Sequence, residues 1–419
     1  MNKIVVNGGR RLSGEVTVGG SKNAALPILF GGIVTGDVCT FSNLPRVSDV
    51  LQTLEILKFL GARIRFLQSG DVRVDYSSVR AACAPCTLTS AIRGSTYLLG
   101  AMLARFGKAE LGGAGGCDFG SRPIDQHLLG FERMGAVVTC RESGVVLEAP
   151  NGLHGATIPL AMPSVGATAN LMIAASLTEG ETEIRNAAAE PHVAALAAFL
   201  GDAGARITGV GTDTICVQGV PKLHGTHNAI IPDMIEAGTY LCAGVACGGP
   251  VRVRAVCPEH LTPLLDAFSK MGAQIETGAR SITVTAPKGY QCTDIVTGPF
   301  PAFPTDLHPQ MAALFCLGNR ASGEGSVTEL VFESRFRYIE ELRLMGAAVS
   351  VRDRCAFIQP SSLQAKKLRS PDLRGGAALL LAALATNGQS EITNASTIGR
   401  GYEHLEAKLR ALGAHITVF

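Results

Sequence analysis

A chain of 419 residues exceeds one ordinary domain, and its 47% apolar content is enough to build large buried cores, which excludes intrinsic disorder. There are 37 basic and 35 acidic residues, which leaves a net charge of +2 and argues against nucleic-acid binding. The longest apolar stretch, 377–385, is about half of the roughly 20 residues that a membrane span needs. We therefore expect neither nucleic acid nor membrane as a partner.

The first residues predict a short strand followed by a Gly-Gly turn at 8–9, without the apolar core of a secretory signal. This start indicates a cytoplasmic protein. The chain has 12 cysteines without regular spacing, and in a reducing compartment these are expected to be free thiols.

Six predicted helices end in a Gly-Ala pair that is followed at once by an alternating strand. The glycines of these pairs are Gly61, Gly135, Gly204, Gly272, Gly346 and Gly413. Glycine at this place predicts a left-handed helix cap. A second kind of helix alternates with the first: it begins at Ser or Asp, is rich in Ala and Leu nearly all round, and ends in Gly before a strand. Its clearest copies span 21–36, 164–180, 306–323 and 372–388, and weaker copies end at 107 and 248.

Each repeat of roughly 70 residues therefore predicts one buried helix, one amphipathic outer helix such as 403–412, and several strands, which is an α/β fold. A solenoid, a ring or two lobes of three repeats would accommodate six copies. Helices that are apolar all round need enclosure, and this favours two lobes. With threefold lobes, the helix starts would converge and offer free N–H groups to an anionic, phosphorylated ligand. These starts are Ser21, Ser164, Asp233, Asp306 and Asp372.

The segment 111–120 carries five glycines around Cys117, and Arg122 follows closely. A mobile loop that holds a thiol near a guanidinium predicts a reactive cysteine, although a small residue in a turn is the alternative. The other thiols lack this setting. The pair Cys83 and Cys86 has no second pair with which to bind zinc, and the cysteines in apolar helices should lie in the core. The latter are Cys242, Cys247 and Cys316.

Lys22 falls in the first turn of an apolar helix, where a cation opposes the helix dipole unless an anion is nearby. A solvated lysine is the alternative. Asp306 either caps a helix, as the comparable places of Asp233 and Asp372 favour, or acts as a base in a cleft.

Four arginines near helix boundaries suit phosphate and carboxylate, although each alone is typical of a surface ion pair. They are Arg93, Arg335, Arg374 and Arg400.

Together these segments make the chain similar, over essentially its whole length, to the UDP-N-acetylglucosamine 1-carboxyvinyltransferases, enolpyruvyl transferases of the EPSP synthase superfamily. The runs that carry the resemblance are 20–27, the Cys117 loop with 122–127, 164–168, 303–306, 333–336, 372–374 and 400–403.

The resemblance implies a two-domain inside-out α/β barrel (an inverse αβ prism) of six βαβαββ-type repeats, three in each lobe. One lobe is expected to comprise 1–20 plus 231–419 and to carry Asp306, Arg335, Arg374 and Arg400. The other is expected to comprise 21–230 and to carry the Cys117 loop, with the active site in the cleft between the lobes.

The implied reaction moves the enolpyruvyl group of phosphoenolpyruvate to the 3′-hydroxyl of UDP-N-acetylglucosamine and releases phosphate, as the committed step toward peptidoglycan. It passes through a tetrahedral ketal and uses no metal or organic cofactor. Cys117 corresponds to the general acid and the target of fosfomycin, and Asp306 to the group that takes the hydroxyl proton. Lys22 corresponds to a catalytic contact with the phosphate and the intermediate.

The resemblance also assigns contacts to each substrate. For phosphoenolpyruvate they are Lys22, Asn23, Arg122, Arg335, Arg374 and Arg400. For the nucleotide sugar they are Asn23, Arg93, Arg122, Pro123, Ile124, Asp125, Gln126, Met162, Pro163, Ser164, Val165, Asp306 and Val331.

Three positions depart from the family pattern. Ala114 stands where relatives usually have proline. Met234 stands where they usually have arginine, and Met162 where some have lysine, and these two changes remove positive charge near the nucleotide-sugar site. Two other functions stay open. The sister transferase that acts on shikimate 3-phosphate shares the fold but lacks the cysteine loop, and an inactive paralogue would bind nucleotide sugar without turnover.

Overall fold

The computed structural model describes residues 2–81, 83–112, 124–142, 144–287 and 289–419, which fall into two compact units. The terminal unit, which holds both chain ends, comprises residues 2–19 and 232–419. The central unit comprises 20–231 without the residues that lie outside the described ranges. Among the described residues, no helix is long and apolar enough to cross a membrane.

The core of the central unit is built around three inner helices whose residues are mostly buried on every side. They are α1 (Lys22–Gly31), α4 (Leu98–Phe106) and α6 (Val165–Ala175). The side chain of Ser21 caps α1 by accepting the Ala24 N–H at 3.3 Å, and Ser164 caps α6 in the same way through Ala167. The chain continues from α1 through the 3₁₀ turn η1 (Gly32–Thr35) to Gly36, which has a positive φ. The predicted starts of α1 and α6 are therefore confirmed.

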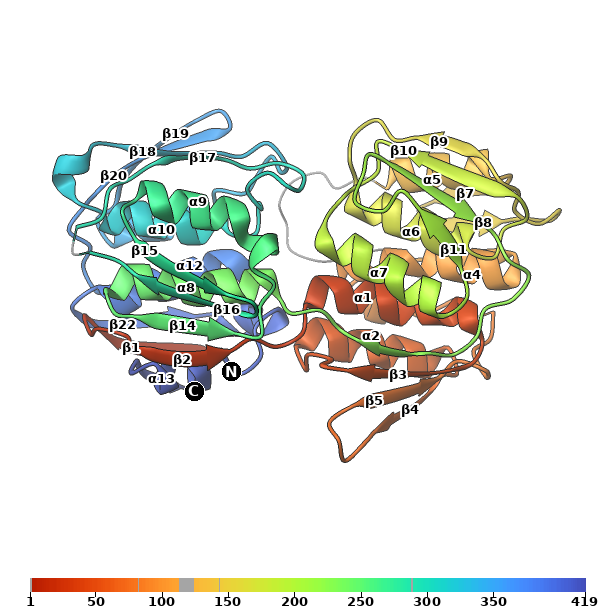
Figure 1. The fold of residues 1–419 in the computed structure, drawn as a ribbon, viewed down its shortest axis with the longest axis horizontal. Coiled ribbons are helices and arrows are strands. Elements are labelled where there is room, and N and C mark those ends of the chain that lie inside the picture. The colour runs from red at the N-terminus through yellow and green to blue at the C-terminus, as the bar shows by residue number, and fades with distance from the viewer. Residues whose placement is uncertain (1, 82, 113–123, 143, 288) are drawn as a thin grey trace. The chain divides into compact units, whose positions relative to one another are not determined.

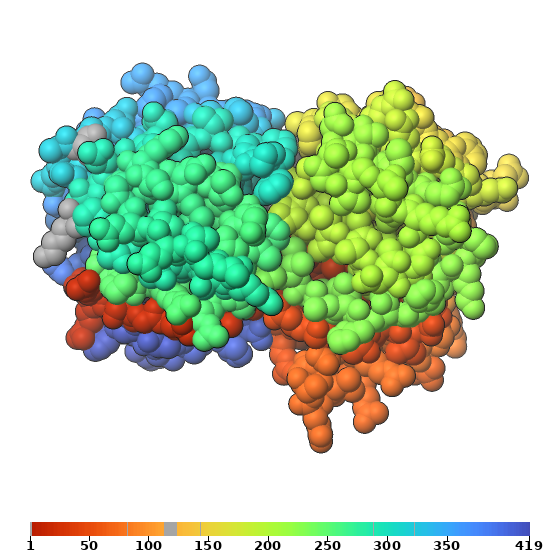
Figure 2. All heavy atoms as spheres, viewed as in Figure 1, coloured from red at the N-terminus to blue at the C-terminus, as the bar shows by residue number. Residues whose placement is uncertain are grey.

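Outer helices and short strands surround these inner helices. The outer helices are α2 (Ser48–Phe59), α5 (Asp125–Arg133) and α7 (Pro191–Asp202), with the short α3 (Cys86–Thr89) and η2 (Arg93–Tyr97) between α2 and α4. The strands are β3 (Val38–Ser42), β4 (Arg63–Phe66), β5 (Val72–Asp75), β6 (Lys108–Leu111), β7 (Val137–Arg141), β8 (Gly144–Glu148), β9 (Thr157–Pro159), β10 (Glu181–Arg185), β11 (Arg206–Thr208), β12 (Thr214–Gln218) and β13 (His227–Ala229). The β4–β5 hairpin projects from its unit, in orange in Figure 2.

The terminal unit repeats this plan. Its inner helices are α8 (Met234–Cys247), α10 (His308–Leu317) and α12 (Leu373–Ala385), and its outer helices are α9 (Thr262–Lys270), α11 (Tyr338–Leu344) and α13 (Leu405–Ala411). The short 3₁₀ segments are η3 (Pro258–Leu261), η4 (Arg320–Ser322) and η5 (Ala395–Arg400). The strands are β1 (Lys3–Gly8), β2 (Gly14–Thr17), β14 (Val251–Arg254), β15 (Gln274–Gly278), β16 (Ser281–Thr285), β17 (Asp294–Val296), β18 (Gly325–Thr328), β19 (Ala348–Arg352), β20 (Cys355–Gln359), β21 (Lys367–Arg369), β22 (Gly388–Thr393) and β23 (His415–Val418). In Figure 1 the inner helices lie between the strands labelled β17 and β18 and those labelled β14 and β22.

Six small sheets share one pairing plan in the described part of the chain. In each four-stranded sheet one pair is parallel and two are antiparallel, as in the order β17-β18-β20-β19. The sheet β6-β8-β7 has three strands, and at the place of the fourth a single parallel bridge joins Ala84 to Leu111. The β1 strand pairs with β22 and β23, so the two chain ends complete one sheet. This sixfold α/β plan confirms the fold class and the repeats predicted from the sequence.

The Gly-Ala signature marks a real left-handed cap in every repeat. All six glycines have φ between 86° and 106°, a region that side chains other than glycine seldom adopt. At Gly61 an added Cβ would also lie 2.5 Å from the carbonyl oxygen of Ser78. The predicted caps are therefore confirmed.

Candidate functional site

The carboxylate of Asp306 lies between two buried guanidinium groups of the terminal unit. Its Oδ1 accepts a hydrogen bond from Nη2 of Arg335 at 2.7 Å. Its Oδ2 accepts from Nε and Nη2 of Arg374 at 3.1 and 3.0 Å. The Asp306 side chain is 25% exposed, whereas Arg335 and Arg374 are 2% and 1% exposed. The structure therefore brings together three of the residues predicted for substrate contact.

These contacts correct the expectation that Asp306 is a helix cap. Helix α10 begins at His308, its N-cap residue is Leu307, and no side chain caps it. Asp233 and Asp372 do cap α8 and α12, since each carboxylate accepts two backbone N–H groups of the following turn. Asp306 precedes its helix by one residue more than they do, and its carboxylate binds arginines instead.

The expectation of surface ion pairs is likewise wrong for Arg335 and Arg374, because both lie almost fully buried. Burial by itself lowers the pKa of the Arg374 guanidinium, but attraction to Asp306, with smaller contributions from Tyr402 and Asp233, raises that pKa above its ordinary value. The carbon of the Arg374 guanidinium also lies 5.2 Å from the centre of the Tyr402 ring. The Arg374 charge is therefore permanent and held in a fixed place.

A buried polar network joins Tyr402 to two inner helices of the terminal unit. The Tyr402 hydroxyl lies 2.9 Å from Oγ1 of Thr239 on α8, and Nε2 of Gln310 on α10 donates to both groups, at 3.1 and 3.0 Å. All three residues are at most 3% exposed. The ring beside Arg374 is therefore fixed by hydrogen bonds from two inner helices.

In the central unit, Lys22 pairs with a carboxylate that sequence analysis missed. Nζ of Lys22 lies 3.2 Å from Oδ2 of Asp49, and the two side chains are 12% and 7% exposed. The solvated-lysine alternative is therefore wrong. Asp49 is the second residue of α2, where the helix dipole favours an acidic side chain. This pair supplies the anion that a lysine at the first position of α1 requires.

Five of the residues predicted to contact nucleotide sugar lie at helix starts of the central unit. Arg93 begins η2, Asp125 and Gln126 begin α5, and Ser164 and Val165 lie at the start of α6. Two of these starts are joined, since the backbone N–H of Met162 donates to Oε1 of Gln126 at 3.3 Å.

Three further residues that the resemblance assigns to the nucleotide sugar lie on exposed or half-buried loops. Met162 is 56% exposed and Pro163 is exposed, while Ile124 is half-buried just before α5. Asn23 is half-buried in the first turn of α1. The departure at Met162 thus concerns an exposed side chain.

Other predicted residues belong to the terminal unit or lie outside the described residues. Val331 is 37% exposed in the loop after β18, and Arg400 ends η5 and is half-buried. Met234, the other departure, is half-buried at the first position of α8. Outside the described residues lie Cys117, Ala114, Arg122 and Pro123.

His127, next to the predicted nucleotide-sugar residues, belongs to a buried network that sequence analysis did not anticipate. Its Nδ1 lies 2.9 Å from Nδ2 of Asn170, which donates to the Thr96 carbonyl at 2.8 Å. Oδ1 of Asn170 accepts the Gly100 N–H at 2.8 Å, so α4, α5 and α6 are joined. Burial, with a smaller effect of the Arg93 charge, lowers the pKa of His127 to about 4. The folded protein therefore keeps this imidazole neutral.

The lowered pKa of His127 predicts that the free energy of unfolding decreases as the pH falls below neutral. Because its folded pKa of about 4 lies below the unfolded value of 6.5, the unfolded chain binds more protons between these values. The contribution of His127 to the free energy of unfolding is complete above pH 6.5 and is lost as the pH falls toward 4. The whole loss is on the order of 3 kcal/mol. The melting temperature of His127→Gln measured from pH 7.5 to 5 should depend less on pH than that of the wild type. The control is His404→Gln, whose imidazole is 72% exposed. Equal pH dependence in all three proteins would contradict this assignment.

The described cysteines are free thiols. Cys242 and Cys316 are fully buried as expected, whereas Cys247 is half-buried. Burial raises the pKa of Cys247 and Cys316 to about 12, so both thiols are unreactive. Cys83 and Cys86 are exposed, and within the described ranges no group of His, Cys, Asp or Glu is arranged to hold a metal ion.

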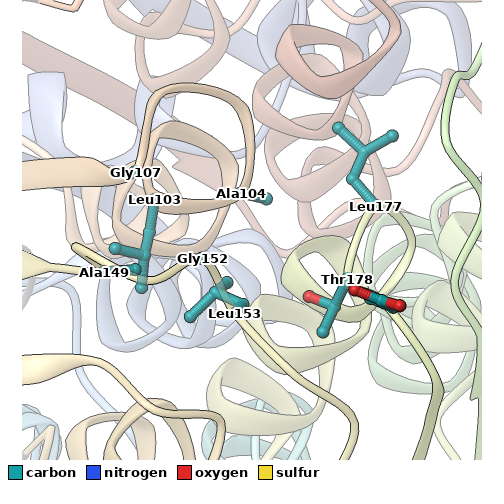
Figure 3. A pocket seen from close by; sticks show the side chains of 9 residues that line it. Leu103, Ala104, Gly107, Ala149, Gly152, Leu153, Leu177 and Thr178 are labelled. Carbon is teal, nitrogen blue, oxygen red and sulfur yellow. The ribbon is translucent and has the colours of Figure 1, made fainter.

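A cavity of about 250 Å³ lies elsewhere in the central unit, at the ends of α4 and α6. Figure 3 shows Leu103, Leu153 and Leu177 among its lining side chains. Thr178 and Glu179 are its polar side chains, and no cation lines it. This cavity is therefore unsuited to an anionic, phosphorylated ligand.

Comparisons with known proteins agree over nearly the whole chain. The profile of the EPSP synthase (3-phosphoshikimate 1-carboxyvinyltransferase) family matches residues 6–409. A protein of Bacillus cereus, UDP-N-acetylglucosamine 1-carboxyvinyltransferase 2, is 43% identical over 417 residues, which is 99% of this chain and 96% of that protein. A protein of the same name from Caldanaerobacter subterraneus is 44% identical over 419 residues, 99% of each chain.

Solved structures share the fold. The enolpyruvyl transferase NikO from Streptomyces tendae has a TM-score of 0.89 at 27% identity and covers 99% of this chain, which in turn covers 98% of NikO. An EPSP synthase from Acinetobacter baumannii has a TM-score of 0.76 at 18% identity, covers 100% of each chain, and shows likeness of fold alone. These structures confirm the inverse α/β architecture expected from the sequence.

Proposed function

We infer, from the premise that this chain belongs to the EPSP synthase family, that it transfers the enolpyruvyl group of phosphoenolpyruvate to the 3′-hydroxyl of UDP-N-acetylglucosamine and releases phosphate. The observation that carries this proposal is full-length identity of 43–44% to relatives named for that reaction. We place the reaction in the cytoplasm, as the committed step toward peptidoglycan.

The buried arginines suit the anionic substrate. Phosphoenolpyruvate carries a carboxylate and a phosphate, and each can accept paired hydrogen bonds from a guanidinium. Arg335 and Arg374 are buried, so water screens their charges little. We assign these two residues, with Arg400, Asn23 and Arg122, to phosphoenolpyruvate. Their charges would stabilise the tetrahedral ketal, which carries the same anionic groups.

Asp306 is the proposed acceptor of the hydroxyl proton. Both of its oxygens accept hydrogen bonds from guanidinium groups, which makes the carboxylate a weak base as it stands. An anionic substrate that takes over the hydrogen bonds of Arg335 or Arg374 would release one oxygen of Asp306. The substrate would thus prepare the base that deprotonates its co-substrate.

The remaining roles follow the family motif. The 3′-hydroxyl oxygen bonds to C2 of phosphoenolpyruvate while the Cys117 thiol gives its proton to C3. In the second step the bond from C2 to the phosphate oxygen breaks and C3 returns a proton to the Cys117 thiolate, which restores the double bond. The departing phosphate takes the proton held by Asp306. Lys22, held by Asp49, would stabilise charge on the phosphate. The nucleotide sugar is assigned to Asn23, Arg93, Asp306, Val331 and the segments 122–126 and 162–165.

Phosphate release is the direct test. The purified chain with phosphoenolpyruvate and UDP-N-acetylglucosamine should release phosphate at a rate that depends on both substrates. The control replaces the nucleotide sugar with shikimate 3-phosphate as the acceptor. This tests the sister reaction, from which the matching family takes its name. Release with shikimate 3-phosphate alone would overturn the choice of acceptor. Binding of UDP-N-acetylglucosamine without any release would indicate the inactive paralogue.

A further inference from the structure

Glu329 is a buried carboxylate that the proposed mechanism does not use. It follows β18 directly in the terminal unit and is 1% exposed. Buried carboxylates are rare because their charge loses its hydration, so each of them needs compensating hydrogen bonds. The partners of Glu329 come from the two chain segments that carry Asp306 and Arg335.

One oxygen of Glu329 closes the loop that leads to Arg335. Oε1 accepts the backbone N–H groups of Val331 and Phe332, at 2.7 and 2.8 Å. The Phe332 ring centre lies 5.2 Å from the guanidinium carbon of Arg335. The path of this loop therefore determines where the side chains of Arg335 and Val331 lie.

The other oxygen reaches the segment that carries Asp306. Oε2 accepts the hydroxyl hydrogen of Thr305 at 2.8 Å, and Nε2 of His308 lies 3.4 Å away. These residues flank Asp306 on either side. Nδ1 of His308 lies 3.2 Å from the Tyr338 hydroxyl, and burial keeps the pKa of this histidine well below its ordinary value. Glu329 therefore faces a neutral imidazole on this side.

We propose that Glu329 is a positioning residue, which holds the Asp306 and Arg335 segments in register so that base and guanidinium meet the substrates together. The inference rests on the proposed function, because it assigns to Glu329 the placement of two residues of that reaction. The 2.7 Å hydrogen bond from Arg335 to Asp306 joins these two segments directly. Glu329 joins the same two segments a second time, through Thr305 on one side and through Val331 and Phe332 on the other.

Two substitutions separate this role from bulk stability. Glu329→Ala removes all of the side-chain contacts. Glu329→Gln keeps an oxygen for the Val331 and Phe332 N–H groups, and its amide can donate to the Thr305 hydroxyl, which accepts as well as donates. The matched control is Glu333→Ala, four residues further along the same loop, whose side chain is 65% exposed.

The experiment measures kcat, the KM of each substrate, the melting temperature, and hydrogen exchange of the amides of residues 330–332 without substrate. We expect Glu329→Ala to lower kcat about 100-fold, the effect of a displacement near 1 Å, and to speed exchange at Val331 and Phe332. Glu329→Gln should recover most of the rate, and Glu333→Ala should match the wild type.

Two results would overturn the inference. One is a Glu329→Ala protein whose melting temperature falls while kcat per folded molecule and both KM values stay at wild-type levels, which indicates a purely structural role. The other is unchanged exchange at Val331 and Phe332. A wild-type chain without turnover would overturn the proposed function instead, and exchange would then decide by itself whether Glu329 holds the loop.

Discussion

Asp306→Ala is expected to lower turnover by about 10²–10⁴-fold, the range for loss of a general base. The physical reason is that the acceptor of the hydroxyl proton disappears while Arg335 and Arg374 keep their charges. The same change leaves two almost fully buried guanidiniums without their shared carboxylate. The free energy of unfolding should fall by up to about 3–5 kcal/mol, the range for a broken buried ion pair.

Added anion distinguishes the two effects of this substitution. Inorganic phosphate should raise the melting temperature of Asp306→Ala more than that of the wild type, because it can replace the missing carboxylate. Turnover should stay low, since phosphate at this place does not act as the base. Asp294→Ala, at an exposed carboxylate on β17, is the control and should leave both quantities near wild type. Turnover of Asp306→Ala within tenfold of the wild type would refute the assigned role.

Cys117→Ser is expected to abolish most turnover, again by about 10²–10⁴-fold, because a serine hydroxyl is too weak an acid to protonate carbon. Cys117→Asp should retain activity, since a carboxylic acid can donate the proton. Fosfomycin, an epoxide, should alkylate the wild-type thiol and stop turnover, but should leave Cys117→Asp active. Phosphate release and mass spectrometry of the peptide that contains residue 117 measure both effects.

The other cysteines provide the controls for this prediction. The thiols of Cys242 and Cys316 are fully buried, so neither should be labelled. Cys140 is exposed, and Cys140→Ser should keep both wild-type turnover and sensitivity to fosfomycin. Loss of turnover with the label on a cysteine other than Cys117 would contradict the assignment of the general acid.

Much of the fold could be predicted because its signals are local. A glycine that ends a helix acts on its own φ angle, and a Ser or Asp cap acts on the next turn, as Ser21 and Asp372 do. Such features need no knowledge of distant residues. Their recurrence indicated six repeats, and the apolar inner helices indicated enclosure. The ordered motifs then identified the family and named the predicted site residues.

The partners of those residues were decided by tertiary structure. Asp306 is capable of capping a helix like Asp233, and its actual contact is with Arg374, 68 positions away. Lys22 was recognised in a helix start, but Asp49 reaches it from another helix. Glu329 gave no signal in the sequence, because one glutamate after a strand resembles any surface residue. The sequence by itself thus determined the repeats, the caps and the family. Only tertiary structure decided which charges are buried together, since burial and ion pairing depend on distances between elements that no local pattern encodes.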